Sequence, residues 1–281
     1  MPSRISIRQS ETNDKDAIEY LINFEFFTHQ HIDWHSFSQW LGHSSFQVAT
    51  VDNEIIACLS APNEIKEVAW IRLFACSALY SREKVWNLLL DTIKEALPDS
   101  VEMICALSLN NWFSELLIQN NFVNRQNIII LEWNQTSLPN FENNPNVIIK
   151  PVELSDIPEI VALDRRSFPP IWQVPLNSMM EAFQQAGYFT KAIFNQKIVG
   201  YQLCTQSQTS AHLARLAVEP DLQGRKIGSQ LIFDMQRHYL SSGINCISVN
   251  TQDDNFSSQS LYNKMGFQLI EEKYPVFVLE I

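Results

Sequence analysis

The feature that most constrains the fold is an internal repeat, because one arrangement of strands and helices is written twice along the 281 residues. The stretch ISIRQSETNDKDAIEYL resembles VIIKPVELSDIPEIVAL, and WIRLFACSALYSREKVWNLLLDTI resembles LARLAVEPDLQGRKIGSQLIFDM. The offset between the copies runs only from 142 residues (Asp14 to Asp156) to 145 residues (Leu117 to Tyr262). An offset this constant over several segments indicates a duplicated domain.

Each copy alternates between short β-rich runs and stretches with the 3.6-residue period of a helix. Two β-rich runs meet at Asp52-Asn53 in the first copy and at Asn195-Gln196 in the second, as in a hairpin. The runs NIIILEW and PVFVLEI are expected to close the two sheets. We predict an α/β (α+β) fold of two tandem domains, each with a mixed, mostly antiparallel central sheet flanked by helices. The predicted domains are residues 1–134 and 147–281, joined by the polar linker 135–146.

Charge and composition exclude several classes of partner. The formal net charge of −11 disfavours nucleic acid and anionic membranes, which attract basic surfaces. Residues 1–144 hold 9 basic and 18 acidic side chains, and residues 145–281 hold 11 and 13, so an anionic ligand favours the second half. No run of residues is apolar enough for a membrane span or a secretion signal. We therefore expect a cytoplasmic protein.

Cysteine and histidine give no sign of a metal or a disulfide. The five cysteines are odd in number and share no CxxC spacing. His31 and His35 have a spacing that can hold a metal on a helix, with His29 nearby, but no acidic or cysteine partner is evident. We predict no metal site.

A positively charged loop with two glycines occurs only in the second copy. It follows a β-rich run, opens a helical pattern and reads Gln223, Gly224, Arg225, Lys226, Ile227, Gly228, Ser229. A helix N-terminus presents unpaired N–H groups, glycine lets a ligand approach the backbone, and the two cations add charge. The expected guest is a pyrophosphate, and the alternative is that the glycines serve only the turn. The first copy has no glycine there and carries Val85 in place of Gly228.

A second signal follows in NFSSQSLYNKMGF, residues 255–267. Tyr262 lies in mid-helix, where a tyrosine is usually core, and Gly266 is expected to end the helix in a left-handed conformation. The first copy has Leu117 in place of Tyr262 and Asn121 in place of Gly266, and asparagine also tolerates that conformation.

Taken together, the two signals resemble the acetyl-CoA signature of the GNAT superfamily of N-acyltransferases. The matching positions are Gln223, Gly228, Asn255, Ser258, Leu261, Tyr262, Lys264, Gly266 and Phe267. Lys226 stands where the family usually has its first glycine. The resemblance implies a catalytic GNAT domain in the second copy and a degenerate GNAT-like domain in the first.

The resemblance also implies roles for individual residues. Acetyl-CoA is expected to contact Leu216, Ala217, Val218, all seven residues of the loop from Gln223 to Ser229, Asn255, Ser258 and Tyr262. A bulge at Ala217 to Val218 would direct the Val218 N–H to the thioester carbonyl, and Tyr262 would act as general acid. Glu219 is the first candidate for the general base, with Asp253, Asp254 and water as alternatives. Within the family, the second copy looks closest to the ribosomal-protein alanine acetyltransferases. Those enzymes carry a glutamate base five residues before the motif asparagine, and this chain has Asn250 at that position.

Three functions stay open at this stage. The first is an acetyl-CoA-dependent N-acetyltransferase acting on an amine of a small molecule or of a protein. The second is an acyl-CoA-binding regulatory protein without turnover. The third is a structural interaction module, which the acidic, tryptophan-rich first half favours. The sequence identifies neither the amine nor the oligomeric state.

Overall fold

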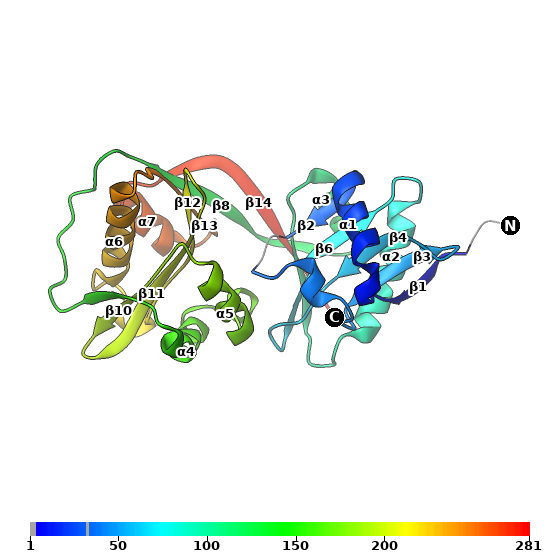
Figure 1. The fold of residues 1–281 in the computed structure, drawn as a ribbon, viewed down its shortest axis with the longest axis horizontal. Coiled ribbons are helices and arrows are strands. Elements are labelled where there is room, and N and C mark those ends of the chain that lie inside the picture. The colour runs from blue at the N-terminus through cyan, green and yellow to red at the C-terminus, as the bar shows by residue number, and fades with distance from the viewer. Residues whose placement is uncertain (1–3, 32–33) are drawn as a thin grey trace. The chain divides into compact units, whose positions relative to one another are not determined.

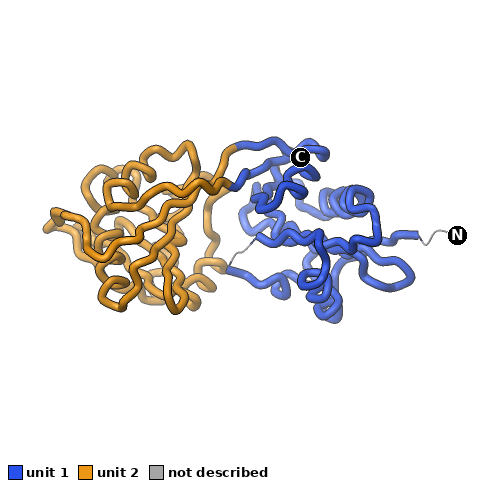
Figure 2. Tube along the Cα trace, turned by 90° about the horizontal axis from the view of Figure 1, so that it is seen from above, with its two compact units in different colours: residues 1–125, 274–281 blue, residues 126–273 orange. Residues whose placement is uncertain are grey.

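The chain forms two compact units. The computed structural model describes residues 4–31 and 34–281. Unit 1 consists of Met1–Arg125 and Tyr274–Ile281, and unit 2 consists of Gln126–Lys273 (Figure 2). Each unit has β-strands covered by helices, and hydrogen-bonded strand pairs are mostly antiparallel. The predicted fold class of two tandem α/β domains is therefore confirmed.

Unit 1 contains a five-stranded sheet in the order β1-β3-β4-β6-β2. Beside it, β5 pairs in parallel with β7, and β7 pairs antiparallel with the end of β14. Its elements are β1 (Ser6–Gln9), η1 (Thr12–Asp14), α1 (Lys15–Phe24), β2 (Phe27–Gln30), η2 (Phe37–Trp40), β3 (Phe46–Val51), β4 (Glu54–Ser60), β5 (Val68–Trp70), β6 (Leu73–Cys76), α2 (Arg82–Ala96), β7 (Met103–Leu107), α3 (Asn111–Gln119) and the start of β8 (Val123–Asn134).

Unit 2 contains a sheet in the order β8-β13-β12-β11-β10-β9. Figure 1 shows α6 and α7 on one side of these strands and α4 and α5 on the other. Its elements are β9 (Ile148–Pro151), η3 (Leu154–Asp156), α4 (Ile157–Ser167), η4 (Pro170–Trp172), α5 (Leu176–Gln185), β10 (Tyr188–Phe194), β11 (Lys197–Gln206), β12 (Ala211–Val218), η5 (Pro220–Leu222), α6 (Ile227–Ser241), β13 (Cys246–Gln252), α7 (Phe256–Lys264) and the first part, up to Lys273, of β14 (Gln268–Glu280).

The closing strands are exchanged between the two copies. β8 follows the first copy in sequence, yet its residues 128–134 pair antiparallel with β13 in unit 2. β14 is the last strand of the chain, and its residues 276–280 pair antiparallel with β7 in unit 1. The units therefore differ from the expected division at residues 134 and 147. NIIILEW and PVFVLEI are both short apolar strands, so the pattern of either one suits either sheet.

Each unit has its own hydrophobic core, to which the exchanged strand contributes. Trp133 of β8 is fully buried in the core of unit 2, and Phe277 of β14 is 3% exposed in the core of unit 1. Burying one large apolar side chain stabilises a fold by roughly 1.5–3 kcal/mol. The exchange is thus anchored by side chains as well as by backbone pairing.

The turn residues behave as their sequence predicts. Asp52, Asn53, Asn195 and Gln196 have φ of 51°, 68°, 49° and 63°, the left-handed values of a two-residue hairpin turn. Asn121 and Gly266 have φ of 65° and 86° after α3 and α7. Both hairpins and both left-handed helix ends are therefore confirmed.

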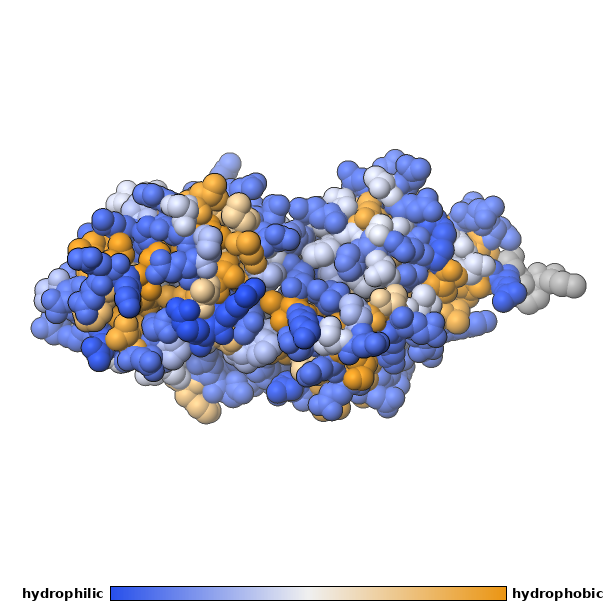
Figure 3. All heavy atoms as spheres, turned by 90° about the horizontal axis from the view of Figure 1, so that it is seen from below, coloured by the Kyte–Doolittle hydropathy of each residue, from blue (hydrophilic) through white to orange (hydrophobic). Residues whose placement is uncertain are grey.

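The surface mixes polar and apolar groups. On the face shown in Figure 3, apolar residues (orange) are interspersed among hydrophilic ones (blue). Within residues 4–31 and 34–281, the helices are all too short or too polar to cross a bilayer.

Candidate functional site

The positively charged loop of residues 223–229, which we call the anion loop because a pyrophosphate is expected there, lies at the N-terminus of α6. Residues 223–226 are exposed, and Ile227 is buried at the first turn of the helix. Gly224 has φ of 77°, and Lys226 takes the left-handed conformation with φ of 65°. A lysine there costs roughly 1–2 kcal/mol, which a glycine avoids. The helix dipole, the first amides of α6 and two exposed cationic side chains converge here, an arrangement that suits an anion.

Gly228 connects the loop to the second motif. A β-carbon at this position would lie 3.1 Å from Cδ2 of Leu261 on α7 and 3.7 Å from Cγ2 of Val218 on β12. A larger residue would force Leu261 to move, because 3.1 Å is closer than most carbon atoms approach. The glycine therefore allows the first turn of α6 to pack tightly against the helix that carries Tyr262.

The bulge expected at Ala217 to Val218 lies earlier in β12, at Ala214. The register changes from Leu203 opposite Arg215 to Cys204 opposite Leu213, so Ala214 is the extra residue. The expected position of the bulge was therefore wrong. An extra residue in one strand changes which backbone groups face the neighbouring strand from that point onward.

This bulge fixes the direction of the backbone groups at the end of β12. The N–H of Glu219 donates to the carbonyl of Val199 on β11 at 2.9 Å. Because backbone groups alternate between the two sides of a strand, Ala217 also faces β11. The N–H groups of Leu216 and Val218 face the other side, where β12 pairs with β13 only over its first three residues. We call residues 214–218 on this side, where the resemblance leads us to expect acetyl-CoA, the coenzyme edge of β12.

Of the three strand residues expected to contact acetyl-CoA, two present their amides at the coenzyme edge. Val218, the expected oxyanion donor, is one of them and Leu216 is the other. Ala217 directs its amide to β11 instead, because the bulge at Ala214 sets the alternation.

Tyr262 lies on α7 and is 5% exposed. Its ring centroid is 5.7 Å from that of Phe267, and Leu216 and Leu261 pack against the same apolar cluster. Burial raises the pKa of the phenol above its ordinary value, and the Cys204 thiol adds to this effect. The phenol is therefore protonated at neutral pH and is a weaker acid than an ordinary tyrosine.

The polar motif residues at the start of α7 cap the helix. Oδ1 of Asn255 accepts the N–H of Ser258 at 3.1 Å. An N-cap of this kind stabilises a helix by about 1 kcal/mol. The cap accounts for asparagine at position 255, and Ser258 contributes its backbone rather than its hydroxyl.

Two of the three carboxylates expected as candidate general bases, Glu219 and Asp253, are held by other groups, and Asp254 is exposed. Arg166 donates to Glu219 through Nε at 3.0 and 3.1 Å and through Nη2 at 2.8 Å. Both oxygens of Glu219 are thus held in an ion pair with Arg166. The side chain of Asn127 donates to Asp253 at 2.7 Å and lowers the pKa of Asp253. Asp253 is therefore a weaker base than an ordinary aspartate.

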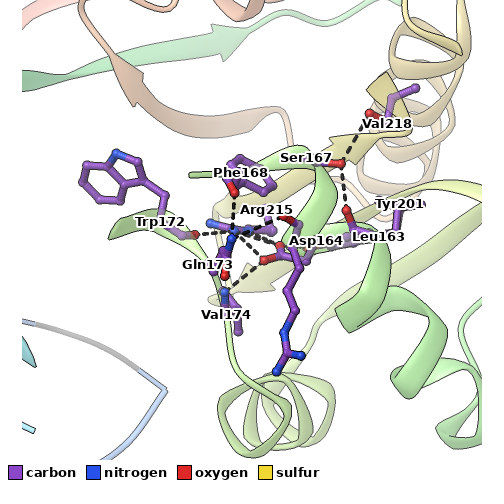
Figure 4. Close-up of polar contacts among 11 residues, drawn as sticks. Leu163, Asp164, Ser167, Phe168, Trp172, Gln173, Val174, Tyr201, Arg215 and Val218 are labelled. Atoms are coloured by element: carbon purple, nitrogen blue, oxygen red, sulfur yellow. Dashed lines mark hydrogen bonds and ion pairs between the residues drawn. The ribbon is translucent and has the colours of Figure 1, made fainter. Parts of the chain in front are cut away.

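A buried ion pair that sequence reasoning missed lies on the α4 side of the sheet. The carboxylate of Asp164 is fully buried and accepts hydrogen bonds from Nε and Nη2 of Arg215 at 2.8 and 3.0 Å (Figure 4). The hydroxyl of Tyr201 and the N–H of Val174 donate to the same carboxylate. Asp164 lies on the face of α4 that carries Ile157, Ile160 and Val161. A charged residue at an apolar position of the helical pattern was the available signal.

The ion pair fixes the segment that follows α4. The guanidinium of Arg215 lies 3.7 Å from the ring centroid of Phe168 and donates to the carbonyl of Trp172. Gln173 donates to the carbonyl of Phe168 at 3.0 Å. Arg215 follows the bulge residue Ala214, so the segment 168–174 is attached to β12 directly beside the bulge.

Part of the expected linker packs on the anion loop. Oε2 of Glu142 lies 2.6 Å from Nζ of Lys226, and both side chains are exposed. Asn144 donates through Nδ2 to the carbonyl of Arg225 at 3.0 Å and through its N–H to Oε1 of Gln230 at 3.0 Å. The segment thus holds the loop and places one negative charge beside its cations.

Unit 1 has different groups at the corresponding positions. Ser81 caps α2 by accepting the N–H of Lys84 at 3.3 Å. Val85 and Leu117, the counterparts of Gly228 and Tyr262, are fully buried in the core. A search of residues 4–31 and 34–281 finds no group of three side chains that could hold a metal.

The fold and the site together define a class of protein. It is an α/β domain in which the N-terminus of α6 lies beside amides of β12 that face away from β11. A model of the acetyltransferase (GNAT) family matches residues 157–267, which lie within unit 2. The resemblance seen in the sequence is therefore confirmed for the part of unit 2 that matches the GNAT family model. A search of curated proteins finds no match.

Solved structures share the fold over the whole chain. A GCN5-related N-acetyltransferase from Sphaerobacter thermophilus has a TM-score of 0.65 at 15% identity, covering 100% of this chain and 96% of that one. A tandem GNAT protein from the clavulanic acid biosynthesis pathway has a TM-score of 0.67 at 10% identity, covering 99% and 98%. A probable N-acyltransferase from Enterococcus faecalis V583 has a TM-score of 0.72 at 11% identity, covering 99% and 73%. The tandem arrangement is thus shared with known structures.

Proposed function

We propose that unit 2 transfers an acetyl group from acetyl-CoA to an amine. One observation carries the proposal: the anion loop, the coenzyme edge of β12 and the helix of Tyr262 come together at Gly228. Gly228 begins α6 and lies against Val218 and Leu261. The match to the GNAT family model supports acyl transfer in general, and the choice of acetyl-CoA rests on this site.

The residues of unit 2 fit the parts of the coenzyme. The loop 223–229 would hold the pyrophosphate through its amides and through Arg225 and Lys226. The amides of Leu216 and Val218 would bind the amide-bearing arm as a neighbouring strand would. Acetyl-CoA supplies the thioester that is cleaved.

The chemistry expected of the chain is electrostatic stabilisation and proton transfer. The N–H of Val218 would stabilise negative charge on the acyl oxygen. Tyr262, which burial keeps protonated, would give a proton to the departing sulfur. The amine would approach from the side of the segment 168–174 and lose its proton to water, since Arg166 occupies Glu219. An amine of a small molecule and an amine of a peptide both suit this proposal, as does a cytoplasmic location.

One observation favours a second function, an acyl-CoA-binding regulatory protein without turnover. Glu219 is held in an ion pair with Arg166, and Asn127 lowers the pKa of Asp253, so two of the three candidate carboxylates are engaged by other side chains. Such a protein would bind acetyl-CoA through the same loop and leave the thioester intact.

Calorimetric titration with acetyl-CoA tests binding. Arg225→Glu should abolish binding, because it places a negative charge in the anion loop. Arg237→Glu is the matched control, since it makes the same charge change on α6 about 15 Å from the loop and should leave binding unchanged. Equal binding by both variants would contradict the proposed site.

Thioester consumption against a panel of amines and peptides then separates the two functions. Acceptor-dependent release of free thiol supports the transferase. Tight binding without release for any acceptor favours the regulatory protein.

A further inference from the structure

We propose that unit 1 has replaced the coenzyme with a strand of its own chain. Residues 25–30, which include β2, occupy the place in unit 1 that corresponds to the coenzyme edge of β12. The protein then binds a single coenzyme molecule, in unit 2. The count of bound coenzyme rests on the proposed function, whereas the position of β2 is independent of it.

A shared hydrogen bond aligns the two units at this point. In unit 1 the N–H of Ser77 donates to the carbonyl of Ile56 at 2.8 Å, and in unit 2 the N–H of Glu219 donates to that of Val199 at 2.9 Å. Ile56 and Val199 each lie three residues after the second residue of their hairpin turn. Ser77 therefore corresponds to Glu219, and β6 corresponds to the end of β12.

The strands before this point also correspond. β5 pairs in parallel with β7 over three residues, as the first three residues of β12 do with β13. After these three residues the chain no longer pairs with the parallel strand in either unit. It continues paired with an antiparallel strand, which is β4 in unit 1 and β11 in unit 2.

The amides that correspond to the coenzyme edge are bonded to β2. Counting back from Ser77 makes Phe74 and Cys76 the counterparts of Leu216 and Val218, with backbone groups that face away from β4. β2 pairs antiparallel with β6 on this side. The register places His29 opposite Phe74 and Phe27 opposite Cys76.

The side chains of β2 fill the same region. The ring of His29 is 1% exposed and stacks on Phe113 of α3 at a centroid distance of 3.9 Å. The ring of Phe27 lies 5.5 Å from that of Trp112. The guanidinium of Arg82, the counterpart of Arg225 in the anion loop, lies 4.6 Å from the Phe27 ring. The arginine that could meet a phosphate in unit 1 thus packs on an aromatic ring.

A carboxylate also contacts the turn that precedes α2. Oε2 of Glu25 accepts the N–H of Ala78 at 2.9 Å. Residues 25–30 therefore bind the amides of the strand edge of β6, and Glu25 also binds one amide of the turn between β6 and α2. A coenzyme could enter unit 1 only if these bonds opened and the Phe27 and His29 rings left their contacts.

Hydrogen exchange of the full chain tests the position of β2 without reference to binding. The amides of Phe74 and Cys76 should exchange at least about 10³-fold more slowly than in the unfolded chain, because they are bonded within the core sheet. Their exchange should not change when acetyl-CoA is added. Exchange as fast as that of an exposed loop, or slowing only on addition of acetyl-CoA, would overturn the inference.

A loop graft tests the expectation that the chain binds one coenzyme molecule. Ser81→Gly with Glu83→Lys gives unit 1 a glycine and a cation at the counterparts of Gly224 and Lys226, and calorimetry should still find one acetyl-CoA per chain. Two molecules per chain, in the wild type or in the graft, would overturn the inference. If no coenzyme binds at all, the proposed function fails while slow exchange of Phe74 and Cys76 still supports the position of β2.

Discussion

Acidification should weaken unit 1 through one buried histidine. The ring of His29 is 1% exposed and stacks on Phe113. Burial lowers the pKa of His29 to about 3, and the backbone of Ile71 offsets this only in part. In the unfolded chain a histidine has a pKa of about 6.5. Since the folded pKa is lower, the unfolded state binds more protons between these values, and stability falls as the pH drops from about 6.5 towards 3.

The expected size of the effect follows from the two pKa values. A pH of 5 lies about 1.5 units below the pKa of the histidine in the unfolded chain, so the unfolded histidine is protonated while folded His29 is still neutral. The free energy of unfolding is therefore about 2 kcal/mol lower at pH 5 than at neutral pH. This is a substantial part of the roughly 5–15 kcal/mol that stabilises a typical domain.

His29→Phe isolates this contribution, because phenylalanine keeps the stack on Phe113 and cannot bind a proton. Urea unfolding can be followed by tryptophan fluorescence at pH 7 and pH 5, and the wild type should lose about 2 kcal/mol more than the variant. The half-buried His31 is retained in both proteins, and the charge of His29 is the smallest of the three causes that lower the pKa of His31. His43→Gln removes an exposed histidine and should behave as the wild type does. An identical pH dependence in the wild type and His29→Phe would refute the reasoning.

Three further outcomes concern unit 2. Tyr262→Phe should lower turnover by about 10²–10⁴-fold with coenzyme affinity nearly unchanged, and an unaltered rate of thioester consumption would remove Tyr262 from the mechanism. Arg215→Lys should raise the acceptor KM and leave coenzyme binding unchanged, because lysine cannot replace the two-point contact with Asp164; a lower melting temperature with an unchanged KM would show that the contact is only structural. Glu142→Gln removes a negative charge beside Lys226 and should tighten coenzyme binding a few-fold at low salt and not at high salt, and weaker binding at low salt would contradict this.

Much of the fold could be predicted from the conformational preferences of individual residues. The hairpin turns and the left-handed ends after α3 and α7 follow from asparagine, aspartate and glycine at positions that need positive φ. The loop 223–229 could be predicted as an anion site for the same reason, because glycines and cations at the start of a helix are visible in the sequence alone. The duplication made each assignment in one copy a check on the other.

The position of the bulge and the buried ion pair were not readable in this way. Alternation along β12 changes at Ala214, and no residue type marks that position. Arg215 meets Asp164 across 51 residues of sequence, so only the packing of α4 on the sheet brings them together. Long-range pairing of this kind leaves at most one trace in the sequence, a charge on an apolar helix face.

The sequence by itself determined that the chain is a duplicated α/β protein and that only its second copy carries the anion loop and the tyrosine. The tertiary structure decided which closing strand completes which sheet, where the strand amides point, and that β2 covers the edge of β6. The physical reason is that glycines, turns and helix ends act through their own backbone, whereas strand partners are chosen by surfaces that exist only after the chain has folded. Two copies of one domain offer each strand two nearly equivalent sheets, and the apolar pattern of the strand is the same for both.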